Sequence, residues 1–313
     1  MAQDGQAELR LAAEVAAARG AGHAVVALET SIVAHGLPRP ANLEVGRAMV
    51  AAVHAAGAVP ALTGVVAGAL RVGLDHEALA RLGGDPPPAK AAWRDLARLA
   101  AEGADGATTV SGTLALAGAA GVPVVATGGI GGVHRGAAAS FDVSADLDAL
   151  ARIQAVVVCA GAKSILDLPA TLEWLESRSV PVLGWRTDRL PAFYAADAGL
   201  EIARIDDLGR VAALARSHWA LGGGGLVLAC PSPDPLAAEE VEAWSAKAHE
   251  RAAAAGVAGA DVTPFVLAEM ARLSGGRTVE ANRELVLANA RLAARMAAHL
   301  PPALEAVGPA AYS

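Results

Sequence analysis

Short runs of apolar residues, many of them valine, alternate along the chain with longer segments rich in alanine and leucine. The short runs are almost wholly apolar, which is the pattern of strands buried on both faces. They predict strands at residues 24–28, 58–66, 122–126, 155–159, 180–184 and 226–229. The longer segments predict helices at residues 41–56, 111–120, 145–152, 168–178 and 206–221. This alternation indicates an α/β fold whose sheet lies buried under helices.

The pattern changes after residue 236, where only helices are expected. They are predicted at residues 239–255, 264–273 and 278–298. We expect these C-terminal helices to pack over one end of the sheet. The chain shows no internal repeat and no long linker, and its proline-rich residues 83–89 predict a surface loop. A single domain spanning residues 1–313 is the simplest organisation.

The composition argues against several classes of protein. Of the 313 residues, 54% are hydrophobic and 18% are charged, which is too apolar for a disordered chain. The net charge of −7 argues against binding to nucleic acids or to anionic membrane surfaces, because both need a basic field. Residues 1–10 lack the apolar core of a signal peptide, and Pro123 and several glycines interrupt the uncharged stretch 107–133. A cytoplasmic protein without a membrane span is therefore expected.

The cysteines indicate a structural use of thiols. Cys159 and Cys230 each lie within an apolar run, and neither belongs to a Cys-x-x-Cys pair or to a zinc-ligand pattern. Free cysteine packs in proteins as a small apolar residue. Both cysteines are therefore expected to be buried, reduced and unreactive.

Polar and glycine-rich segments follow three of the predicted strands. Ligands of open α/β sheets bind at the carboxyl ends of the strands, so these segments are candidates for a functional site. They are residues 29–38, 127–146 and 160–167. The glycines of residues 127–136 form either a phosphate-binding loop or a plain turn, and they do not match the dinucleotide fingerprint. Residues 161–164, around Lys163, do not match the Walker loop.

The segment 127–146 carries three further candidates. Ser144 is expected to cap the helix that follows it. Asp146 lies in the first turn of that helix, where a carboxylate complements the helix dipole. Asp142 supplies a hard oxygen ligand, which suits a divalent cation such as Mg²⁺ or Mn²⁺.

Lysine is rare in this chain, and one lysine follows a predicted strand. Of the 25 basic residues, only Lys90, Lys163 and Lys247 are lysines. Lys163 follows a fully apolar strand, and a lysine amine that has lost its proton can form an imine with a sugar carbonyl. Arginine cannot do so, because it keeps its proton. Lys163 is thus a candidate nucleophile, the alternative being a lysine that only extends into solvent, as is expected of Lys247.

Three further polar residues have two interpretations each. Glu29 directly follows the first predicted strand and is either a general acid or the partner of an arginine in an ion pair. His35 and His134 lie in the segments after two strands. Each histidine either forms a hydrogen bond within its loop or contacts a phosphate or the substrate.

Six segments together resemble the pseudouridine-5'-phosphate glycosidases, also called the indigoidine synthase A family. They are residues 27–42, 105–110, 127–146, 160–167, 263–265 and 280–290. The longest matches include Ala-Leu-Glu-Thr-Ser-Ile-Val-Ala-His-Gly at residues 27–36 and Ala-Gly-Ala-Lys-Ser-Ile-Leu-Asp at residues 160–167. The resemblance runs from about residue 8 to about residue 300. It implies a three-layer α/β/α sandwich with a central buried sheet and extra C-terminal helices, assembled as a homotrimer.

The resemblance also implies an activity. A lyase of this family breaks the C–C glycosidic bond of pseudouridine 5'-phosphate reversibly, giving ribose 5-phosphate and uracil. Lys163 would be the nucleophile that attacks C1' and holds the ring-opened sugar as an imine, and Glu29 would be the proton donor. Asp142 would bind a divalent metal, for which Mn²⁺ is expected. Substrate contacts are implied for Lys90, Val110, His134, Ser144, Ala145, Asp146 and Asn289, with Lys90 on the phosphate and Asn289 near the base.

Two other functions stay open. A class I aldolase-like lyase on another sugar phosphate would use the same lysine chemistry but would need neither a metal nor a uracil site. A non-catalytic sugar-phosphate binding protein would use Lys163 only as a charge partner.

The chain also departs from the family at two places. It carries Thr30-Ser31 where relatives carry Ser-Thr, and it differs from them in the segment 91–95 that follows Lys90.

Overall fold

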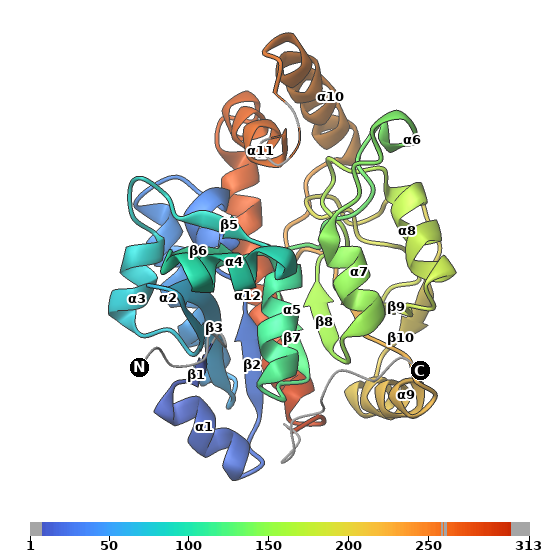
Figure 1. The fold of residues 1–313 in the computed structure, drawn as a ribbon. Coiled ribbons are helices and arrows are strands. Elements are labelled where there is room, and N and C mark those ends of the chain that lie inside the picture. Colours follow the sequence, from blue (N-terminus) through green and yellow to red (C-terminus); the bar gives the residue numbers. More distant parts are fainter. Residues whose placement is uncertain (1–7, 258, 260–261, 302–313) are drawn as a thin grey trace.

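One sheet runs through the molecule, and helices cover both of its faces (Figure 1). The computed structural model describes residues 8–257, 259 and 262–301. The strands within these residues are β1 (Leu9–Leu11), β2 (Val25–Leu28), β3 (Val59–Val66), β4 (Ala69–Val72), β5 (Ala89–Ala91), β6 (Gly106–Thr108), β7 (Val124–Ala126), β8 (Val156–Cys159), β9 (Val182–Trp185), β10 (Ala203–Ile205) and β11 (Leu226–Ala229). Their order is β1-β4-β3-β2-β7-β8-β11-β9-β10, with β6 paired to β3 and β5 paired to β6.

The centre of the sheet is parallel. Neighbouring strands from β3 through β2, β7, β8, β11 and β9 to β10 all run in the same direction. β2, β8 and β11 are buried at every residue, as their apolar runs predict. β3 is longer, and its second half, Thr63–Val66, pairs antiparallel with β4. At Gly64 and Val65 the same strand pairs antiparallel with β6.

The helices form one layer on each face of the sheet. α5 (Val110–Ala119) and α7 (Ala145–Arg152) pack together in front of it, and α2 (Ala41–Ala55) and α12 (Arg277–Ala297) pack together behind it (Figure 1). The other helices are α1 (Ala13–Gly20), α3 (His76–Leu82), α4 (Trp93–Glu102), α6 (Ala137–Ser140), α8 (Leu168–Ser177), α9 (Leu208–Ala220), α10 (Ala238–Ala254) and α11 (Val262–Leu273), and a π-helical turn η1 (Ile32–Gly36) follows β2. The predicted α/β/α sandwich is confirmed.

The C-terminal helices take two different places. α10 and α11 pack against each other beyond the carboxyl ends of the central strands, as expected (Figure 1). α12 instead lies along the face of the sheet, against β2, β7 and β8. The expectation that all three helices cover one end was therefore wrong for α12. Its apolar residues surround most of its circumference, which suits a helix enclosed between the sheet and its neighbours.

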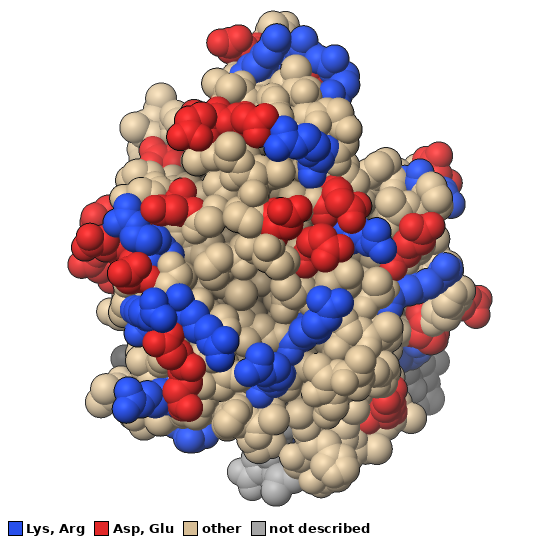
Figure 2. Space-filling view, turned by 180° about the vertical axis from the view of Figure 1, so that it is seen from behind, with Lys and Arg blue, Asp and Glu red and all other residues tan. Residues whose placement is uncertain are grey.

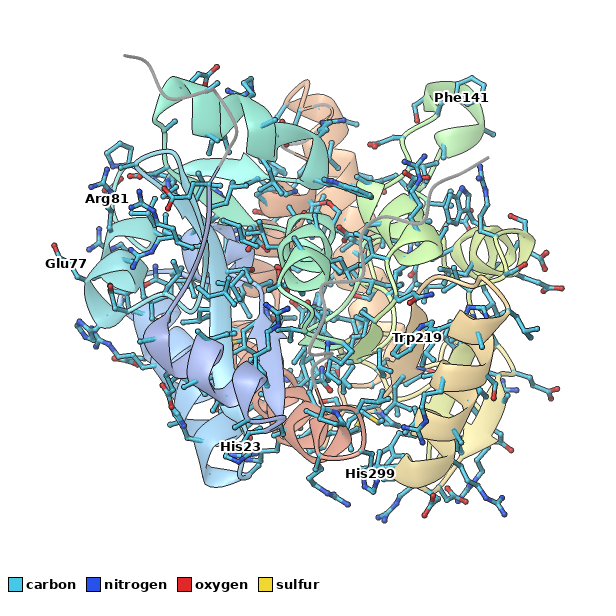
Figure 3. The ribbon with its side chains drawn as sticks, turned by 60° about the horizontal axis from the view of Figure 1, so that its bottom comes forward. His23, Glu77, Arg81, Phe141, Trp219 and His299 are labelled. Atoms are coloured by element: carbon cyan, nitrogen blue, oxygen red, sulfur yellow. The ribbon has the colours of Figure 1, made fainter. Side chains whose placement is uncertain are left out.

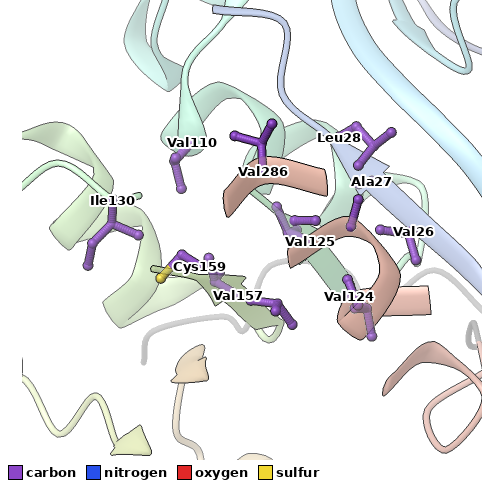
Figure 4. Packing of buried hydrophobic residues seen from close by; sticks show 14 of the residues in the cluster. Val26, Ala27, Leu28, Val110, Val124, Val125, Ile130, Val157, Cys159 and Val286 are labelled. Atoms are coloured by element: carbon purple, nitrogen blue, oxygen red, sulfur yellow. The ribbon is translucent and has the colours of Figure 1, made fainter. Parts of the chain in front are cut away.

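The core between α12 and the sheet contains one of the two cysteines. Val286 of α12 belongs to the same cluster as Ala27 and Val125 of the central strands (Figure 4). Cys159 is completely buried there, and this burial raises the pKa of its thiol to about 12. Cys230 is partly buried, which raises its thiol pKa to about 11. Both thiols are free, and the predicted burial is confirmed for Cys159 but not for Cys230, which is only partly buried.

The surface is charged and mixed in sign. Acidic and basic side chains are interspersed around an uncharged central region on the face seen in Figure 2. Glu77 and Arg81 of α3 lie at the outer edge of the molecule (Figure 3). Residues 83–88 form the predicted loop, and β5 begins at Ala89. Among the helices that the structure describes, none combines the length and the apolar character needed to cross a membrane.

Candidate active site

Three neighbouring strands bring the candidate residues together. β2, β7 and β8 run parallel side by side, so their carboxyl ends lie at one edge of the sheet. Glu29 directly follows β2, and Lys163 follows β8 after a short loop. The pocket at this edge is lined by Glu29, Ser31, Ile32, His35, Gly36, Lys90, Gly128, Gly129, Lys163, Phe193, Thr263, Pro264, Leu267 and Asn282. Glu29, Lys90 and Lys163 therefore share one pocket, while their chemical roles stay predictions.

Glu29 is buried and is held by hydroxyl groups. Its side chain accepts hydrogen bonds from the hydroxyls of Ser31 and Thr127, one on each carboxylate oxygen. The alternative, an ion pair with an arginine, is wrong within the described part of the chain, since no ion pair there includes Glu29. A hydroxyl can donate to a carboxylate and can also accept from a carboxylic acid. Ser31 and Thr127 can therefore stay bonded to Glu29 before and after it transfers a proton.

Lys163 is fixed through its backbone to the loop after β7. Its N–H donates to the Ile130 carbonyl at 3.1 Å, and the Ile130 N–H donates to the Gly161 carbonyl at 3.1 Å. Gly161 has a φ of +75°, and a Cβ there would lie 2.0 Å from the Pro191 carbonyl oxygen. A glycine is thus required two residues before Lys163. The side chain of Lys163 is partly buried and lines the pocket.

The other two lysines differ in their surroundings. Lys90 lies on β5, which is joined to the central sheet through β6 and β3, and it lines the same pocket. Lys247 lies on an exposed face of α10, so its predicted place on the surface is confirmed. Two of the three lysines of this chain are therefore at the pocket.

Two histidines near Lys90 are kept neutral by their environment. Burial, and after it the charge of Lys90, lowers the pKa of His35. Burial also lowers the pKa of His134; the Asp142 carboxylate opposes this effect, and the charges of Lys90 and Lys163 add to it. His35 lines the pocket, and its buried Nε2 atom has no hydrogen-bond partner within the described structure. A neutral imidazole with a free nitrogen is available there for a ligand.

Asp146 and Ser144 shape the loops around the pocket. Asp146 is buried, and its two carboxylate oxygens accept hydrogen bonds from the N–H groups of Gly131 and Ser111, each at 2.8 Å. Ser144 accepts from the Asp146 N–H at 3.2 Å, which confirms the predicted helix cap. Val110, Ser144, Ala145 and Asp146 are absent from the pocket lining, so their contact with substrate remains a prediction.

Close packing explains the glycines at 128, 129, 131 and 132, whereas Gly136 has open space around it and a positive φ of +81°. A Cβ at Gly129 would lie 2.6 Å from the Phe193 ring, and one at Gly131 would lie 2.2 Å from the Ser144 hydroxyl. Larger residues at these positions would push the neighbouring side chains away. The loop therefore brings its backbone close to Phe193 and Ser144, whether or not it also binds a phosphate.

Asp142 and His134 form the candidate metal site. His134 Nδ1 lies 3.8 Å from an Asp142 carboxylate oxygen, and Asp142 is partly exposed. The residues that the structure describes contain no group of three or more His, Cys, Asp or Glu side chains able to hold an ion. One carboxylate and one neutral imidazole fit a cation such as Mn²⁺ only if water or substrate oxygens complete its shell, as is common for ions that bind with a phosphate.

Of two asparagines in α12, Asn282 lines the pocket and Asn289 does not. Asn289 donates to the carbonyls of Thr127, at 2.9 Å, and of Gly128, at 3.3 Å, so any effect on the base would act through this loop. Asn282, which was not predicted, lines the pocket with a buried Oδ1 atom that has no partner within the described structure. Both residues lie in the recognised segment 280–290, and no sequence pattern distinguishes a pocket asparagine from one behind the pocket.

Comparison with known proteins matches almost the whole chain. The model of the family described as indigoidine synthase A like protein matches residues 14–299. A pseudouridine-5'-phosphate glycosidase of Roseiflexus sp. (strain RS-1) is 53% identical over 294 residues, which cover 92% of this chain and 94% of the relative. A second relative of the same name, from Methylobacterium nodulans, is 51% identical over 296 residues, which cover 93% of this chain and 88% of the relative.

Two solved structures share the fold. The prealnumycin C-glycosynthase AlnA in complex with ribulose 5-phosphate superposes with a TM-score of 0.87 at 38% identity, covering 94% of this chain and 97% of that one. An indigoidine synthase A-like protein of Thermotoga maritima superposes with a TM-score of 0.86 at 32% identity, covering 96% and 98%. These likenesses confirm the α/β sandwich.

Proposed function

The chain belongs to the indigoidine synthase A-like family, and we propose on this premise that it is a pseudouridine-5'-phosphate glycosidase. It reversibly cleaves the C–C bond between the sugar and the base of pseudouridine 5'-phosphate, giving ribose 5-phosphate and uracil. The observation that carries the proposal is the shared pocket of Glu29 and Lys163, in a chain 53% identical to a relative of that name.

Lys163 and Glu29 divide the chemistry between them. The Lys163 amine forms a bond to C1', and the ring oxygen leaves C1' and takes a proton. The nitrogen lone pair then forms the C=N bond of an imine as the electron pair of the C1'–C5 bond moves to the uracil carbon. Glu29 gives its proton to that carbon, and water later hydrolyses the imine to free ribose 5-phosphate. Ser31 and Thr127 keep the Glu29 carboxyl in place in both protonation states.

The remaining pocket residues bind and orient the substrate. Lys90 provides a compact positive charge for the phosphate. His35 and Asn282 each have a buried polar atom without a partner in the described structure. An unpartnered buried polar atom is costly, so both sites favour a ligand that supplies hydrogen-bonding groups, such as a ribose or a uracil ring.

We further propose that Asp142, together with His134, holds a divalent cation for which Mn²⁺ is the expected ion. A bound cation would supply positive charge beside the phosphate and would order water there. We also propose a homotrimer, which the family resemblance implies, and a place in the cytoplasm, which the sequence favours. Analytical ultracentrifugation tests the homotrimer directly.

The decisive experiment measures uracil release and covalent trapping together. The wild-type protein is incubated with pseudouridine 5'-phosphate, with and without a chelator. It is then treated with borohydride in the presence of ribose 5-phosphate, which should add the mass of the reduced sugar at Lys163. Lys163→Arg should lose both signals, and Asp142→Ala should lose the metal dependence.

Each competing function has its own result in this experiment. Labelling at Lys163 without uracil release would favour the aldolase-like lyase. Equal labelling of the wild-type and Lys163→Arg proteins would disprove the imine, and the absence of both signals would favour a binding protein. An unchanged rate in the presence of the chelator would remove the cation from the proposal.

A further inference from the structure

Four threonines form a buried hydroxyl cluster beside Glu29 that the proposed reaction does not use. Thr30, Thr63, Thr108 and Thr113 are each 0% exposed. They belong to the segment after β2, to β3, to β6 and to α5. A valine has nearly the same shape as a threonine and would bury no polar group, so the hydroxyls need an explanation other than filling space.

Thr63 lies at the centre of this cluster. Its hydroxyl lies 2.8 Å from the Thr108 hydroxyl and 3.0 Å from the Thr113 hydroxyl, and it donates to the Leu28 carbonyl at 3.2 Å. Its own backbone carbonyl accepts hydrogen bonds from the hydroxyls of Thr30, at 2.7 Å, and Thr108, at 2.9 Å. Buried networks whose members are all bonded are rigid and define one arrangement of the chain.

The contacts of Thr63 bracket Glu29 along the chain. Leu28, the residue before Glu29, accepts from the Thr63 hydroxyl, and Thr30, the residue after it, donates to the Thr63 carbonyl. Thr30 is held a second time, because the Thr108 N–H donates to its hydroxyl at 3.0 Å. Fixing both neighbours fixes the Cα–Cβ direction of Glu29, and with it the region that the carboxyl can reach.

We propose, on the basis of the proposed function, that Thr63 is a positioning residue for the proton donor Glu29. Thr63 does not line the pocket; its hydroxyl acts through the Leu28 carbonyl, and its backbone carbonyl holds Thr30. Proton transfer depends steeply on where the donor lies, whereas binding of the phosphate depends on Lys90, which is on a different strand. Loss of the Thr63 hydroxyl should therefore slow bond cleavage and leave substrate binding unchanged.

The test compares Thr63→Val, which removes the hydroxyl, with Thr63→Ser, which keeps it. Thr187→Val is the matched control, because the Thr187 hydroxyl bonds the backbone of Arg189 in a loop after β9, away from Glu29. Thr63→Val should lower kcat for uracil release by about 10- to 100-fold with an unchanged KM. It should also move the limb of the kcat pH profile that reports the proton donor. Thr63→Ser and Thr187→Val should behave as the wild type does.

Two results would overturn the role of Thr63. One is a wild-type kcat and pH profile in Thr63→Val, and the other is an equal loss in Thr63→Ser, which would indicate that the site needs the threonine shape alone. If Thr63→Val does not unfold cooperatively, Thr30→Val and Thr30→Ser test the other bond beside Glu29, from the Thr30 hydroxyl to the backbone carbonyl of Thr63, which no substitution of Thr63 removes. A wild-type kcat in Thr30→Val would then overturn the role. If the wild type releases no uracil, the proposed function fails and this role fails with it, whereas release by every variant alike overturns this role alone.

Discussion

Asp146 places a buried carboxylate between two segments that border the pocket. One oxygen accepts from the Gly131 N–H in the loop after β7, and the other accepts from the Ser111 N–H at the start of α5. A carboxylate at the first turn of a helix was expected to complement the dipole of its own helix, α7. In the structure it also accepts a hydrogen bond in the first turn of α5, from Ser111. The sequence could not show this contact, because Ser111 and Asp146 are 35 positions apart.

Removing this carboxylate should destabilise the protein strongly. Asp146→Ala leaves two buried N–H groups without partners, and hydrogen bonds to a charged group contribute about 1.5–3 kcal/mol each. We expect the free energy of unfolding, measured with urea, to fall by about 3 kcal/mol or more. Asp148→Ala, on the same helix, is the control: its exposed ion pair with Arg152 should contribute less than about 1 kcal/mol. Equal losses in the two variants would contradict the structural role of Asp146.

The neutral state of His35 should make stability depend on pH. Its pKa in the folded protein is lowered from the ordinary value of 6.5, first by burial and then by Lys90. The unfolded chain therefore binds a proton more readily than the folded one, and the free energy of unfolding should decrease as the pH falls below about 6.5. His35→Gln should reduce this decrease, while His23→Gln, at an exposed position, should leave it unchanged. Urea unfolding at several pH values measures both, and identical slopes in the wild type and His35→Gln would contradict the prediction.

Single residues differed in how far the sequence could reveal them. Lys163 stood out because lysine is rare in this chain and because it follows an apolar strand. The hydroxyl of Thr127 on Glu29 could not be predicted, since the contact joins residues 98 positions apart. The departure from the family at Thr30-Ser31 proves compatible with the site, because Ser31 bonds Glu29 and Thr30 bonds Thr63.

The loop after β8 is an element whose path depends on one glycine. Gly161 adopts a left-handed conformation, and its Cα passes so close to the Pro191 carbonyl that no side chain fits. Lys163 follows two residues later, with its N–H bonded to Ile130. The conformation of the loop and the position of the lysine are therefore set together.

Gly161→Ala should displace this loop. We expect the free energy of unfolding to fall by more than about 2 kcal/mol and borohydride labelling at Lys163 to be lost. Gly222→Ala is a matched control: Gly222 also has a positive φ, of +84°, but its Cβ would meet nothing within 4 Å, so only the strain of about 1–2 kcal/mol applies. A Gly161→Ala protein that is labelled normally would show that the lysine does not depend on this turn.

Elements were predictable from the sequence when their apolar runs were long. All six predicted strands are present, since each buries a nearly continuous apolar run in the parallel sheet. β1, β4, β5, β6 and β10 were not predicted, because they are only three or four residues long and all but β6 carry an arginine or a lysine. Such strands owe their existence to a neighbour that is already in place rather than to their own composition.

At the scale of the whole molecule, α12 connects the two halves of the sheet. It contacts β2, β7 and β8 and also packs against α2, so its residues are buried on nearly every side. α10 is almost as long but is buried along one narrow stripe. The two helices thus have very different environments.

Hydrogen exchange should separate these two helices. The amides of α12 should exchange only through global unfolding and should be protected as strongly as those of β2, β7 and β8, because local opening of α12 would expose the core. The amides of α10 should exchange faster through local opening. Mass spectrometry of peptides from both helices measures this difference. Equal protection of α10 and α12 would show that the C-terminal helices open as one unit.

The overall architecture was predictable, and the place of α12 within it was not. Alternating strands and helices determine a layered α/β fold, because each apolar face needs a partner. The face of the sheet that α12 covers is determined by contacts with strands more than 100 residues earlier in the chain. The hydrogen bond from Asn289 to the Thr127 carbonyl is one example. The pocket could likewise be assigned to the carboxyl ends of the strands, while its wall from α11 and Asn282 depends on the folded chain.

The double pairing of β3 separates the supports of the two pocket lysines. Its first half belongs to the parallel sheet that leads to Lys163, and its second half carries the antiparallel extension through β6 to β5 and Lys90. Lys90 and Lys163 therefore reach the same pocket from different strands, which are connected to each other through β3. Substitutions in β5, whose residues form none of the bonds of the threonine cluster, can therefore change the surroundings of Lys90 while Glu29 and Lys163 keep their supports, which gives evolution a separate route to new substrates on this scaffold.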